Sequence, residues 1–465
     1  MPELPEVETV VRTLEQKIHN RIIESVDIIY ERIVDYPDAT AFSACLKGQK
    51  FETFDRRGKF LVFNLTDYVM IAHLRMEGKF YVYPEHREPD KHTHIVFKLD
   101  KGELHYNDVR KFGRFWLYEK GQPLKALESL GYEPFDEKLN SEWLKSYCQH
   151  KNTPIKTQLL DQSMIAGIGN IYANEICFDV RINPMHPACF VSREKWDQII
   201  ESTRKILAEA IKAGGTTIRS YTSSLGVTGM FQQNLHVHSR AHEKCECGTE
   251  IKKCFVNGRG TYYCPNCQKE KALFAAVTGN IGSGKSTVSE LIKEQGYPVI
   301  SCDEINSQLW LDNEIRAEIR RITGEDEKKE VSRVIYSDPE IKEKLEEYLH
   351  GLIWQRVREF YEEHIHDPAV FVEVPLLFET DWYRRFDCNI LVTCSVETAV
   401  ERLQRTRNMS RENIMAVLNN QTPDSEKRAV ADRVIDNDST LDKLSIAVEK
   451  MLGDIVKFRQ EKADK

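Results

Sequence analysis

Residues 264–287 read CPNCQKEKALFAAVTGNIGSGKST, and this stretch divides the chain into two chemically different parts. It begins with a C-x-x-C pair of the kind that binds metal. It ends in GNIGSGKS, Gly279 to Ser286, which matches the phosphate-binding pattern G-x-x-x-x-G-K-[ST] in full. The segment LFAAVTG in front of this loop predicts a strand and the residues behind it predict a helix, as such a loop requires. The stretch therefore predicts a small module that a bound metal ion stabilises, followed directly by a nucleotide-binding domain.

The glycine loop predicts how ATP is held. Backbone N–H groups at the start of the helix would cradle phosphates, Lys285 would reach the outer phosphates, and the Ser286 hydroxyl would contact Mg²⁺. The predicted ATP-binding residues of the loop are Gly279, Asn280, Ile281, Gly282, Ser283, Gly284, Lys285, Ser286 and Thr287. Beyond the loop, helical segments alternate with apolar strands such as AVFVEVPLLF and CNILVTC, which predicts an α/β domain with a parallel sheet.

Length and composition indicate a multidomain globular protein. A chain of 465 residues is too long for one hydrophobic core, and 41% hydrophobic and 30% charged residues are ordinary for a folded protein. The start, MPELPEVETV, lacks the basic and apolar regions of a signal peptide, and no apolar run is long enough for a membrane span. We therefore expect a cytoplasmic protein without a membrane partner, in which the twelve cysteines are metal ligands or core residues rather than disulfides.

The net charge of −8 is unevenly distributed. Through Glu270 the chain has 37 basic and 36 acidic residues, and beyond it 28 and 37. A near-neutral first part can bind a polyanion only through local patches. Three basic clusters qualify, although each alone could be a solvated face. They are Arg56, Arg57 and Lys59; Arg110, Lys111 and Arg114; and Lys252, Lys253 and Arg259.

The first part changes its hydrophobic period along the chain. Apolar residues from Val7 to Ile18 recur at helical spacing behind Pro5. Segments such as KFLVFNL, YVMIAHLRM, KFYVY, HTHIVFKL and GRFWLYE then predict short antiparallel strands up to about residue 120, and so a β-sandwich or barrel. Helical spacing returns from about Asn140 to Ala213, with a glycine interruption at AGIGNIYANE.

The N-terminus offers a nucleophile. If Met1 is removed, Pro2 presents a secondary amine, and an α-amine titrates near 7.7–8.0, so that part of it is neutral at pH 7. Attack on a sugar carbon would give a cationic iminium that draws electrons from neighbouring C–O bonds. Glu3 could move protons beside it. The alternative from this stretch alone is that Pro2 and Glu3 simply begin a helix.

Several motifs in fixed order decide between these interpretations. They are MPELPEVETV, RRGKF, HLRMEGKF, NDVRKFGRF, GIGNIYANE, FQQNLHVHSR and GRGTYYCPNCQ. With them the chain resembles the formamidopyrimidine-DNA glycosylases from Met1 to about Lys269. The resemblance implies a DNA glycosylase and abasic-site lyase that excises oxidised purines, formamidopyrimidine and 8-oxoguanine, from damaged double-stranded DNA by β,δ-elimination.

The resemblance also implies roles for individual residues. Pro2 would be the nucleophile and Glu3 the acid/base, while Lys59, Asn170 and Arg259 would contact phosphates near the lesion. Met76, Arg110 and Phe112 would fill the gap left by the flipped nucleotide, which agrees with the need of an enzyme that extrudes a base to offset part of the lost stacking. Lys156 and Glu77 match positions near the lesion, and Thr216 to Gly229 corresponds to the lesion-reading loop. The structural alternatives are core packing for Met76 and Phe112 and a cap or turn for Asn170. His92 and His94 alternate on a predicted strand, but no third metal ligand accompanies them.

The segment from His236 to Gln268 has too few apolar residues to form its own core, so we expect a cross-link or a bound metal ion to stabilise it. Cys245, Cys247, Cys264 and Cys267 predict a tetrahedral Zn²⁺ site that would supply folding energy. The family has two residues between the first two cysteines and this chain has one, which tightens the turn. Cys254 as a competing ligand and a redox-active C-x-C pair are the alternatives.

The part from Phe274 to the C-terminus resembles the dephospho-coenzyme A kinases through TGNIGSGKSTVSELIKEQGYPVISCD, VPLLFE, ERLQRTRNMS and ADRVIDN, in this order. The resemblance implies transfer of the ATP γ-phosphate to the ribose 3′-hydroxyl of dephospho-coenzyme A. Asp303 would deprotonate the acceptor, with Arg402 and Arg407 at the lid. The alternatives are a helix cap for Asp303 and a solvated helix face for the arginines.

Several positions depart from the kinase pattern and concern acceptor binding and turnover more than ATP binding. The expected D-x-D reads SCD and retains only Asp303. The other departures are Glu327-Lys328 for Asp-Arg, His350-Gly351 for His-Pro, Val374 before Pro375 with Glu373 where an acid often stands, and Val417 for the arginine of R-x-x-x-Q before Gln421.

Together the patterns predict a multidomain α+β part followed by an α/β part. The expected boundaries are a catalytic β-sandwich at 1–130, a helix-two-turns-helix domain at 131–235, a zinc-finger hairpin at 236–269, a linker at 270–274 and a P-loop kinase domain at 275–465. We expect a monomer with two co-expressed activities. Two alternatives remain: an ATP-binding regulatory module without turnover in the second part, and a DNA-binding module with a blocked Pro2 in the first.

Overall fold

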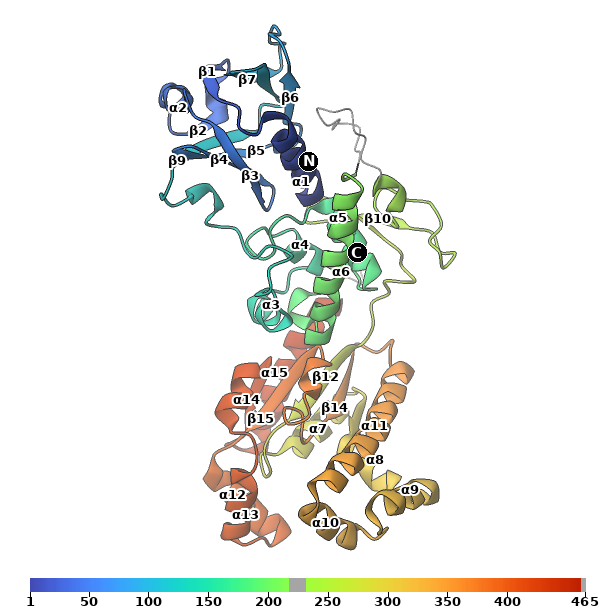
Figure 1. Cartoon of the computed structure of the whole chain (residues 1–465). Helices are drawn as coiled ribbons and strands as arrows, with labels where there is room; N and C mark the ends of the chain where they lie inside the picture. The colour runs from blue at the N-terminus through green and yellow to red at the C-terminus, as the bar shows by residue number, and fades with distance from the viewer. Residues whose placement is uncertain (217–230, 461–465) are drawn as a thin grey trace. The chain divides into compact units, whose positions relative to one another are not determined.

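The computed structural model describes residues 1–216 and 231–460, with side chains described up to Ile455. The chain divides into two compact units, one of Met1–Cys189 and Lys195–Lys269 and one of Phe190–Glu194 and Glu270–Lys465. Figure 1 colours both units along the chain. Among the described helices, none combines the length and apolarity needed to cross a bilayer.

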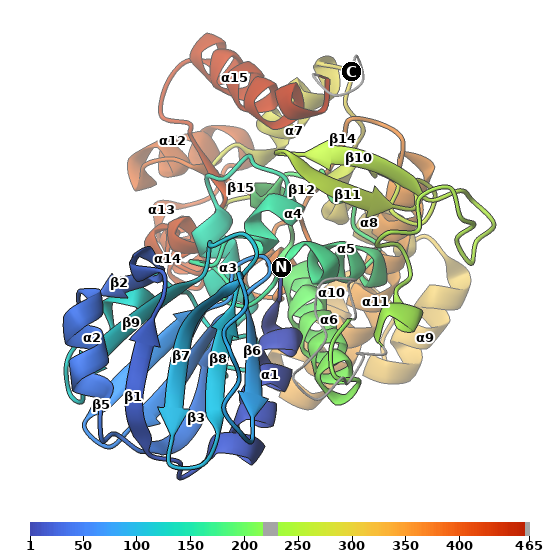
Figure 2. The ribbon, with the colours of Figure 1, turned by 90° about the horizontal axis from the view of Figure 1, so that it is seen from above.

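The first unit begins with helix α1 (Leu4–Ile18) and a β-sandwich, as predicted. One sheet has the order β1-β7-β8-β6 and the other the order β2-β9-β5-β4-β3; Figure 2 shows β1, β7, β8 and β6 side by side. Apolar residues of α1 at helical spacing, among them Val7, Val11 and Leu14, join the core between strands. The bounds are β1 Ile23–Ile28, β2 Val34–Tyr36, α2 Ala39–Leu46, β3 Phe51–Arg57, β4 Phe60–Leu65, β5 Tyr68–His73, β6 Lys79–Tyr83, β7 Thr93–Leu99, β8 Glu103–Asn107 and β9 Arg114–Glu119.

The helical part and a small hairpin complete the first unit. The helices are α3 (Ser141–Cys148), α4 (Ile155–Leu159), α5 (Asn170–Asp179) and α6 (Arg193–Lys212), and the hairpin pairs β10 (Lys252–Val256) with β11 (Arg259–Tyr263). A small cluster of buried apolar residues supports the hairpin module: Phe178 of α5 with Val237, Cys245, Ile251 and Cys264, and Val256 of β10 is buried as well. The sequence therefore predicts correctly that this module is poor in apolar contacts.

The second unit is built on a five-stranded parallel sheet of order β13-β14-β12-β15-β16, as the alternation of strands and helices predicts. The strands are β12 Leu273–Thr278, β13 Val299–Ser301, β14 Ala369–Glu373, β15 Cys388–Thr393 and β16 Arg433–Asp436. The helices are α7 Lys285–Glu294, α8 Cys302–Leu309, α9 Asn313–Thr323, α10 Lys328–Ser337, α11 Pro339–Glu363, α12 Val396–Arg407, α13 Arg411–Asn419, α14 Asp424–Val430 and α15 Leu441–Gln460. The first strand begins at Leu273, inside the segment 270–274 assigned to a linker.

The core of the second unit follows from its strand sequences. The central strands β12, β14 and β15 are buried at every residue, which explains their continuous apolar runs. Phe274 and Ala276 of β12 pack with Ile305 of α8 and with Ile353 and Val357 of α11 in one cluster. Because β12 leads directly into the glycine loop, this packing fixes the base of the phosphate site.

Candidate active sites

The carboxylate of Glu3 lies against the N-terminus of α5. Its Oε1 accepts a hydrogen bond from the Ile171 N–H at 2.9 Å and its Oε2 accepts one from the Tyr172 N–H at 3.4 Å. These amides belong to the first turn of α5, where N–H groups have no partner within the helix and where negative charge is favoured. The side chain of a residue next to the chain terminus is therefore held by a helix more than 160 residues further along.

Two glycines allow this approach. A Cβ on Gly169, the residue before α5, would lie 2.2 Å from Cδ of Glu3. A Cβ on Gly167, whose φ is +98°, would lie 2.5 Å from Cδ1 of Leu4. The glycine interruption in GIGNIYANE thus serves to bring α5 within bonding distance of the N-terminal residues, with Asn170 as its first residue.

Burial and neighbouring charges set the protonation of Glu3. Glu3 is 3% exposed, and this burial raises its pKa to about 7, against the lowering effects of the Lys59 charge and of the two amides. Lys59, also buried, donates from Nζ to the Ile168 carbonyl at 2.8 Å. Burial lowers the Lys59 pKa, opposed by Glu3 and reinforced by Arg259. An acid with a pKa near neutrality can both donate and accept a proton at pH 7.

Glu6 is a further residue of this site that the sequence analysis missed. Its Oε2 accepts from the Glu3 N–H at 2.9 Å, and its Oε1 accepts from the Tyr172 hydroxyl at 2.9 Å and from the Thr216 N–H at 2.8 Å. The available signal was the Glu-x-x-Glu spacing of a capping box at the start of α1. Glu6 thereby joins Glu3 to Thr216; the rest of the segment to Gly229 lies outside the described residues.

Two of the predicted DNA-contacting residues, Lys156 of α4 and Asn170 of α5, bond to the hairpin. Lys156 donates from Nζ to the Gly260 carbonyl and to the Thr261 hydroxyl, both at 2.8 Å, and Asn170 donates to the Gly260 carbonyl at 3.0 Å. Arg259, one residue earlier on β11, is exposed. Its positive charge lowers the Lys59 pKa and the charge of Glu3 raises it, so that Glu3 and Arg259 both lie near Lys59. Lys156 is fully buried, and burial lowers its pKa to about 8.

Met76, Arg110 and Phe112 lie on two neighbouring turns of the sandwich. Met76 follows β5 and is half-buried, whereas Arg110 and Phe112 are exposed in the loop between β8 and β9. The Arg110 guanidinium stacks on the Phe112 ring at 4.7 Å. The alternative that Phe112 is a core residue is wrong, because its ring is on the surface.

Asp108 and Tyr106 determine the geometry of these two turns. The Asp108 carboxylate accepts N–H bonds from Arg110, Phe112 and Gly113 at 2.8–3.0 Å. The Tyr106 hydroxyl lies so near Gly78 and Gly113 that a Cβ on either would come within 2.2 Å of it. The Tyr106 hydroxyl therefore packs closely against both turns, and only glycine fits at these two positions. Of the histidines, His92 precedes β7 instead of lying in it, and His94 bonds the Asp108 carbonyl at 2.7 Å, so they do not form a pair.

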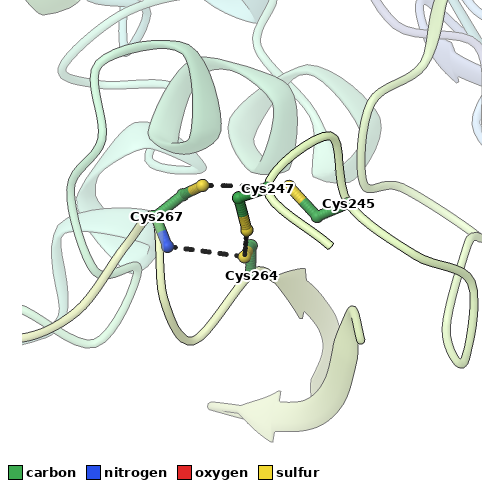
Figure 3. A group of neighbouring side chains, drawn as sticks. All are labelled: Cys245, Cys247, Cys264 and Cys267. Carbon is green, nitrogen blue, oxygen red and sulfur yellow. Dashed lines mark hydrogen bonds between the residues drawn. The ribbon is translucent and has the colours of Figure 1, made fainter. Parts of the chain in front are cut away.

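The four predicted cysteines form one compact group (Figure 3). The Sγ atoms of Cys245, Cys247, Cys264 and Cys267 all lie within 4.8 Å of one another, with Cys245 and Cys267 at 3.8 Å and Cys247 and Cys264 at 3.5 Å. A tetrahedron with Zn–S bonds of about 2.3 Å has edges of about 3.8 Å. The short C-x-C spacing therefore does not prevent four-sulfur ligation, and the group suggests a structural zinc site. Cys254, on β10, is not part of this group.

In the second unit, the phosphate-binding loop joins β12 to α7 as predicted. Gly284 precedes α7 with φ +92°, a conformation that favours glycine, and a Cβ there would lie 2.3 Å from Nδ2 of Asn437. Lys285 donates from Nζ to the carbonyl oxygens of Gly279 at 2.9 Å and Asn280 at 3.4 Å. Its ammonium thus already lies inside the loop.

A cavity of about 550 Å³ opens in front of this loop. Its walls include Lys285, Ser286, Asp303, Arg402 and Arg407, so these five predicted site residues border one space. Arg402 is braced by the Asn437 carbonyl at 2.8 Å. A smaller cavity of about 130 Å³ shares Asp303 with the first, so this exposed carboxylate faces both. Ser301, not Asp303, caps α8, and the cap alternative for Asp303 is therefore wrong.

The sequence shows Glu373 at a position where an acid often stands, but it does not predict the contact of Glu373 with Ser286. Glu373 ends β14, is buried, and accepts a hydrogen bond from the Ser286 hydroxyl at 2.8 Å. A carboxylate and a hydroxyl together in front of a phosphate loop provide the hard oxygen ligands that Mg²⁺ prefers. The signal was an acid at the carboxyl end of a buried strand next to β12.

The departures from the kinase pattern lie in different places. Val417 lines the larger cavity and His350 the smaller one, where its ring meets Trp382 edge-on at 5.9 Å. Gln421 accepts the Ile281 N–H at 2.9 Å and so supports the loop. Glu327 precedes α10, away from both cavities.

Family comparisons match both units. Residues 1–115 match the model described as formamidopyrimidine-DNA glycosylase N-terminal domain, and residues 130–222 match the formamidopyrimidine-DNA glycosylase H2TH domain. Residues 273–443 match the model described as dephospho-CoA kinase.

Individual relatives match the first unit over their whole length. A Bacillus cereus formamidopyrimidine-DNA glycosylase is 47% identical over 273 residues, which are 58% of this chain and 99% of that protein. A protein of the same name from Exiguobacterium is 45% identical over 58% of this chain and all of that protein. A solved complex of Lactococcus lactis Fpg with abasic-site DNA is 38% identical, with a TM-score of 0.55, and covers 57% of this chain and 99% of that one.

The contact between Glu3 and α5 can be tested through Gly169. We expect Gly169→Ala to push the carboxylate away and to speed hydrogen exchange of the Ile171 and Tyr172 amides about ten- to a hundredfold, since losing charge-assisted bonds costs about 1.5–3 kcal/mol. Exchange followed by mass spectrometry measures this. Gly260→Ala is the matched control because a Cβ there would meet only ordinary contacts beyond 3.6 Å. Equal exchange in both variants would contradict the role given to Gly169.

The cysteine group can be tested by metal content. We expect stoichiometric zinc in the purified chain, lost in Cys247→Ser and retained in Cys254→Ser. Removal of the metal by a chelator should expose residues 236–269 to proteolysis, because their apolar core is too small to fold alone. Elemental analysis and mapping of the cleavage sites measure both effects. Full zinc content in Cys247→Ser would show that the C-x-C pair does not ligate.

Proposed function

Because the chain belongs to the formamidopyrimidine-DNA glycosylase family and carries a dephospho-CoA kinase domain behind it, we propose that it is a fusion of two enzymes. The first excises oxidised purines from duplex DNA and cleaves the abasic strand. The second transfers the ATP γ-phosphate to the 3′-hydroxyl of dephospho-coenzyme A. The observation that carries the first assignment is the buried Glu3 carboxylate at the N-terminus of α5 beside Pro2.

In the glycosylase reaction the Pro2 nitrogen, freed by removal of Met1, attacks C1′ of the damaged nucleotide. The bond between C1′ and the base breaks, and the base leaves with its electron pair and a proton. Opening of the sugar gives an iminium on Pro2. Loss of sugar protons to a base then allows the 3′ and 5′ C–O bonds to break in turn, with the iminium as electron sink.

Glu3 is suited to the proton transfers. With a pKa of about 7 it is present in both protonation states at neutral pH, so it can protonate one group and deprotonate the next. The backbone N–H bonds from Ile171 and Tyr172 keep its carboxylate in place between these steps. Glu6 holds the Glu3 backbone from the other side.

DNA is held by local cations, in agreement with the near-neutral charge of this half. Lys59, Asn170 and Arg259 contact the phosphates around the lesion, and Met76, Arg110 and Phe112 enter the space of the extruded nucleotide. The exposed ring of Phe112 and the guanidinium stacked on it lie outside the core, which supports this role. Four cysteine thiolates hold Zn²⁺, which stabilises the hairpin that carries Arg259.

In the kinase reaction Lys285 moves from the loop carbonyls to the outer phosphates of ATP. Asp303, which lines both cavities, accepts the proton of the acceptor hydroxyl as that oxygen attacks the γ-phosphorus and ADP leaves. Arg402 and Arg407 stabilise the charge on the transferring group. Ser286 and Glu373 would hold Mg²⁺, whose charge supports the leaving phosphates.

The nucleophile can be identified by borohydride trapping on duplex DNA with an oxidised purine. We expect a covalent complex whose adduct maps to the peptide that begins at Pro2, because only an amine forms a reducible iminium. Pro2→Gly should lower the trapping yield about tenfold or more with DNA binding nearly unchanged, since a primary amine forms an imine that is cationic only when protonated, whereas proline forms a permanently cationic iminium. An adduct on a lysine, or no adduct with bound DNA, would leave this half as a binding module or as an enzyme with another nucleophile.

The transfer reaction can be tested by ATP-dependent phosphorylation of dephospho-coenzyme A with the full chain. We expect turnover that falls about a hundredfold or more in Lys285→Ala, because a cation on the transferred phosphate is removed. Lys293→Ala, exposed on the same helix α7, should behave as the unaltered chain. ATP binding without product would identify the second half as a nucleotide-binding module. The departures from the kinase pattern at Val417 and Gly351 are consistent with such a loss of turnover.

A further inference from the structure

A buried lysine lies directly behind the phosphate-binding loop. Lys427, on α14, is 1% exposed. Its ammonium donates to Oδ1 of Asn280 at 2.9 Å and pairs with Oε1 of Glu379 at 3.0 Å. A buried ammonium is very costly unless oxygens replace its water shell. Asn280 and Glu379 provide this replacement, and Asn280 is the second residue of the loop.

The segment from Gln421 to Lys427 contacts the loop at three points. Besides the bond from Lys427, Nδ2 of Asn280 donates to Oδ1 of Asp424 at 2.7 Å, and the Ile281 N–H donates to Oε1 of Gln421 at 2.9 Å. Because an ammonium can only donate, the amide oxygen of Asn280 must face Lys427. The amide nitrogen of Asn280 then points to the Asp424 carboxylate, which accepts its hydrogen bond. The rotamer of Asn280 is thus determined from both sides.

The charge of Lys427 reaches the phosphate site. Burial lowers the Lys285 pKa, and the positive charges of Lys427 and Arg407 act in the same direction, against Glu373 and Asp303. The side chain of Glu379 is 25% exposed, so water screens part of its opposing charge. The charge of Lys427 is therefore felt at Lys285, although the carboxylates of Glu379 and Asp424 oppose it nearby.

We propose that Lys427 is a positioning residue for the ATP phosphates, which orients Asn280 and stiffens the first turn of the loop from behind. Glu379 keeps the ammonium in place. The proposal rests on nucleotide binding by the second half, but not on transfer to dephospho-coenzyme A. Segment 421–427 directly follows α13, which contributes Val417 to the wall of the larger cavity, and α13 itself follows α12, which carries Arg402. The segment therefore links the loop to these two helices along the chain.

The test compares nucleotide affinities of full-chain variants by calorimetry. In Lys427→Met we expect the ATP dissociation constant to rise about tenfold, the equivalent of one lost charge-assisted interaction, while AMP binding changes less than about twofold. Lys427→Arg should restore ATP binding to within about threefold, because a cation with several donors returns. Lys293→Met, which removes the same charge from an exposed site on α7, is the control and should bind as the unaltered chain.

The outcomes separate positioning from simple stabilisation. Unchanged ATP affinity in Lys427→Met overturns the proposal. Equal weakening of ATP and AMP without rescue by arginine also overturns it, because a loss of folding affects both ligands alike. If Lys427→Met does not fold, the double variant Lys427→Met/Glu379→Gln removes both charges and serves for the same comparison.

Failure of the proposed reaction would look different. A chain that binds ATP but does not phosphorylate dephospho-coenzyme A contradicts the kinase assignment, whereas the affinity ratios above still decide the role of Lys427. A chain that binds no ATP contradicts both.

Discussion

The first unit depends on a buried negative charge at a helix N-terminus. Removing the Glu3 carboxylate from water costs several kcal/mol, and the site offsets this with two amides of α5, the positive end of that helix and the nearby Lys59 ammonium. The compensation is incomplete, and the raised pKa is the measurable sign of it. The same contact connects the β-sandwich to the helical part, and through Lys156, Asn170 and Gly260 the hairpin joins them. The contact between Glu3 and α5 therefore both joins two parts of the first unit and sets the pKa of the Glu3 carboxyl group.

In the second unit a helix N-terminus again favours a negative charge, but here the ligand would supply that charge. The N-terminus of α7 faces a cavity, and Lys285 bonds to the loop carbonyls in the way that Lys59 bonds to the Ile168 carbonyl. In the first unit the anion is a residue of the chain, so the helix terminus and the carboxylate are preorganised together. In the second unit a phosphate would be that anion, and the loop must hold its shape before the ligand arrives. The contacts of Asn280 with Lys427 and Asp424 provide such rigidity.

Local patterns predict well where the chemistry of a residue depends on its neighbours in sequence. Helical spacing predicts α1, the glycine loop predicts the junction of β12 and α7, and the cysteine spacing predicts the four-sulfur group. Contacts between distant segments cannot be read in this way. Glu6 bonds Thr216 across 210 residues, and Lys427 bonds Asn280 across 147. The charged residues of α14 look like a solvated helix face, and only the fold shows that one of them is buried. Edge strands such as β13, with three half-buried residues, also carry too weak a pattern.

The departures in the second unit separate nucleotide binding from group transfer. Val417 replaces a cation on the wall of the larger cavity, and Gly351 follows a histidine that lines the smaller one. Val417 itself borders the larger cavity, whereas at the second departure it is the retained His350 that borders the smaller one. The loop, its lysine and the contacts behind it are intact, and Glu373 still accepts the Ser286 hydroxyl. Because charge stabilisation of a transferring phosphate is shared among several cations, loss of one lowers the rate without abolishing the site. Arg402 and Arg407 remain at the cavity, so the arrangement favours a slower kinase over a chain that only binds ATP.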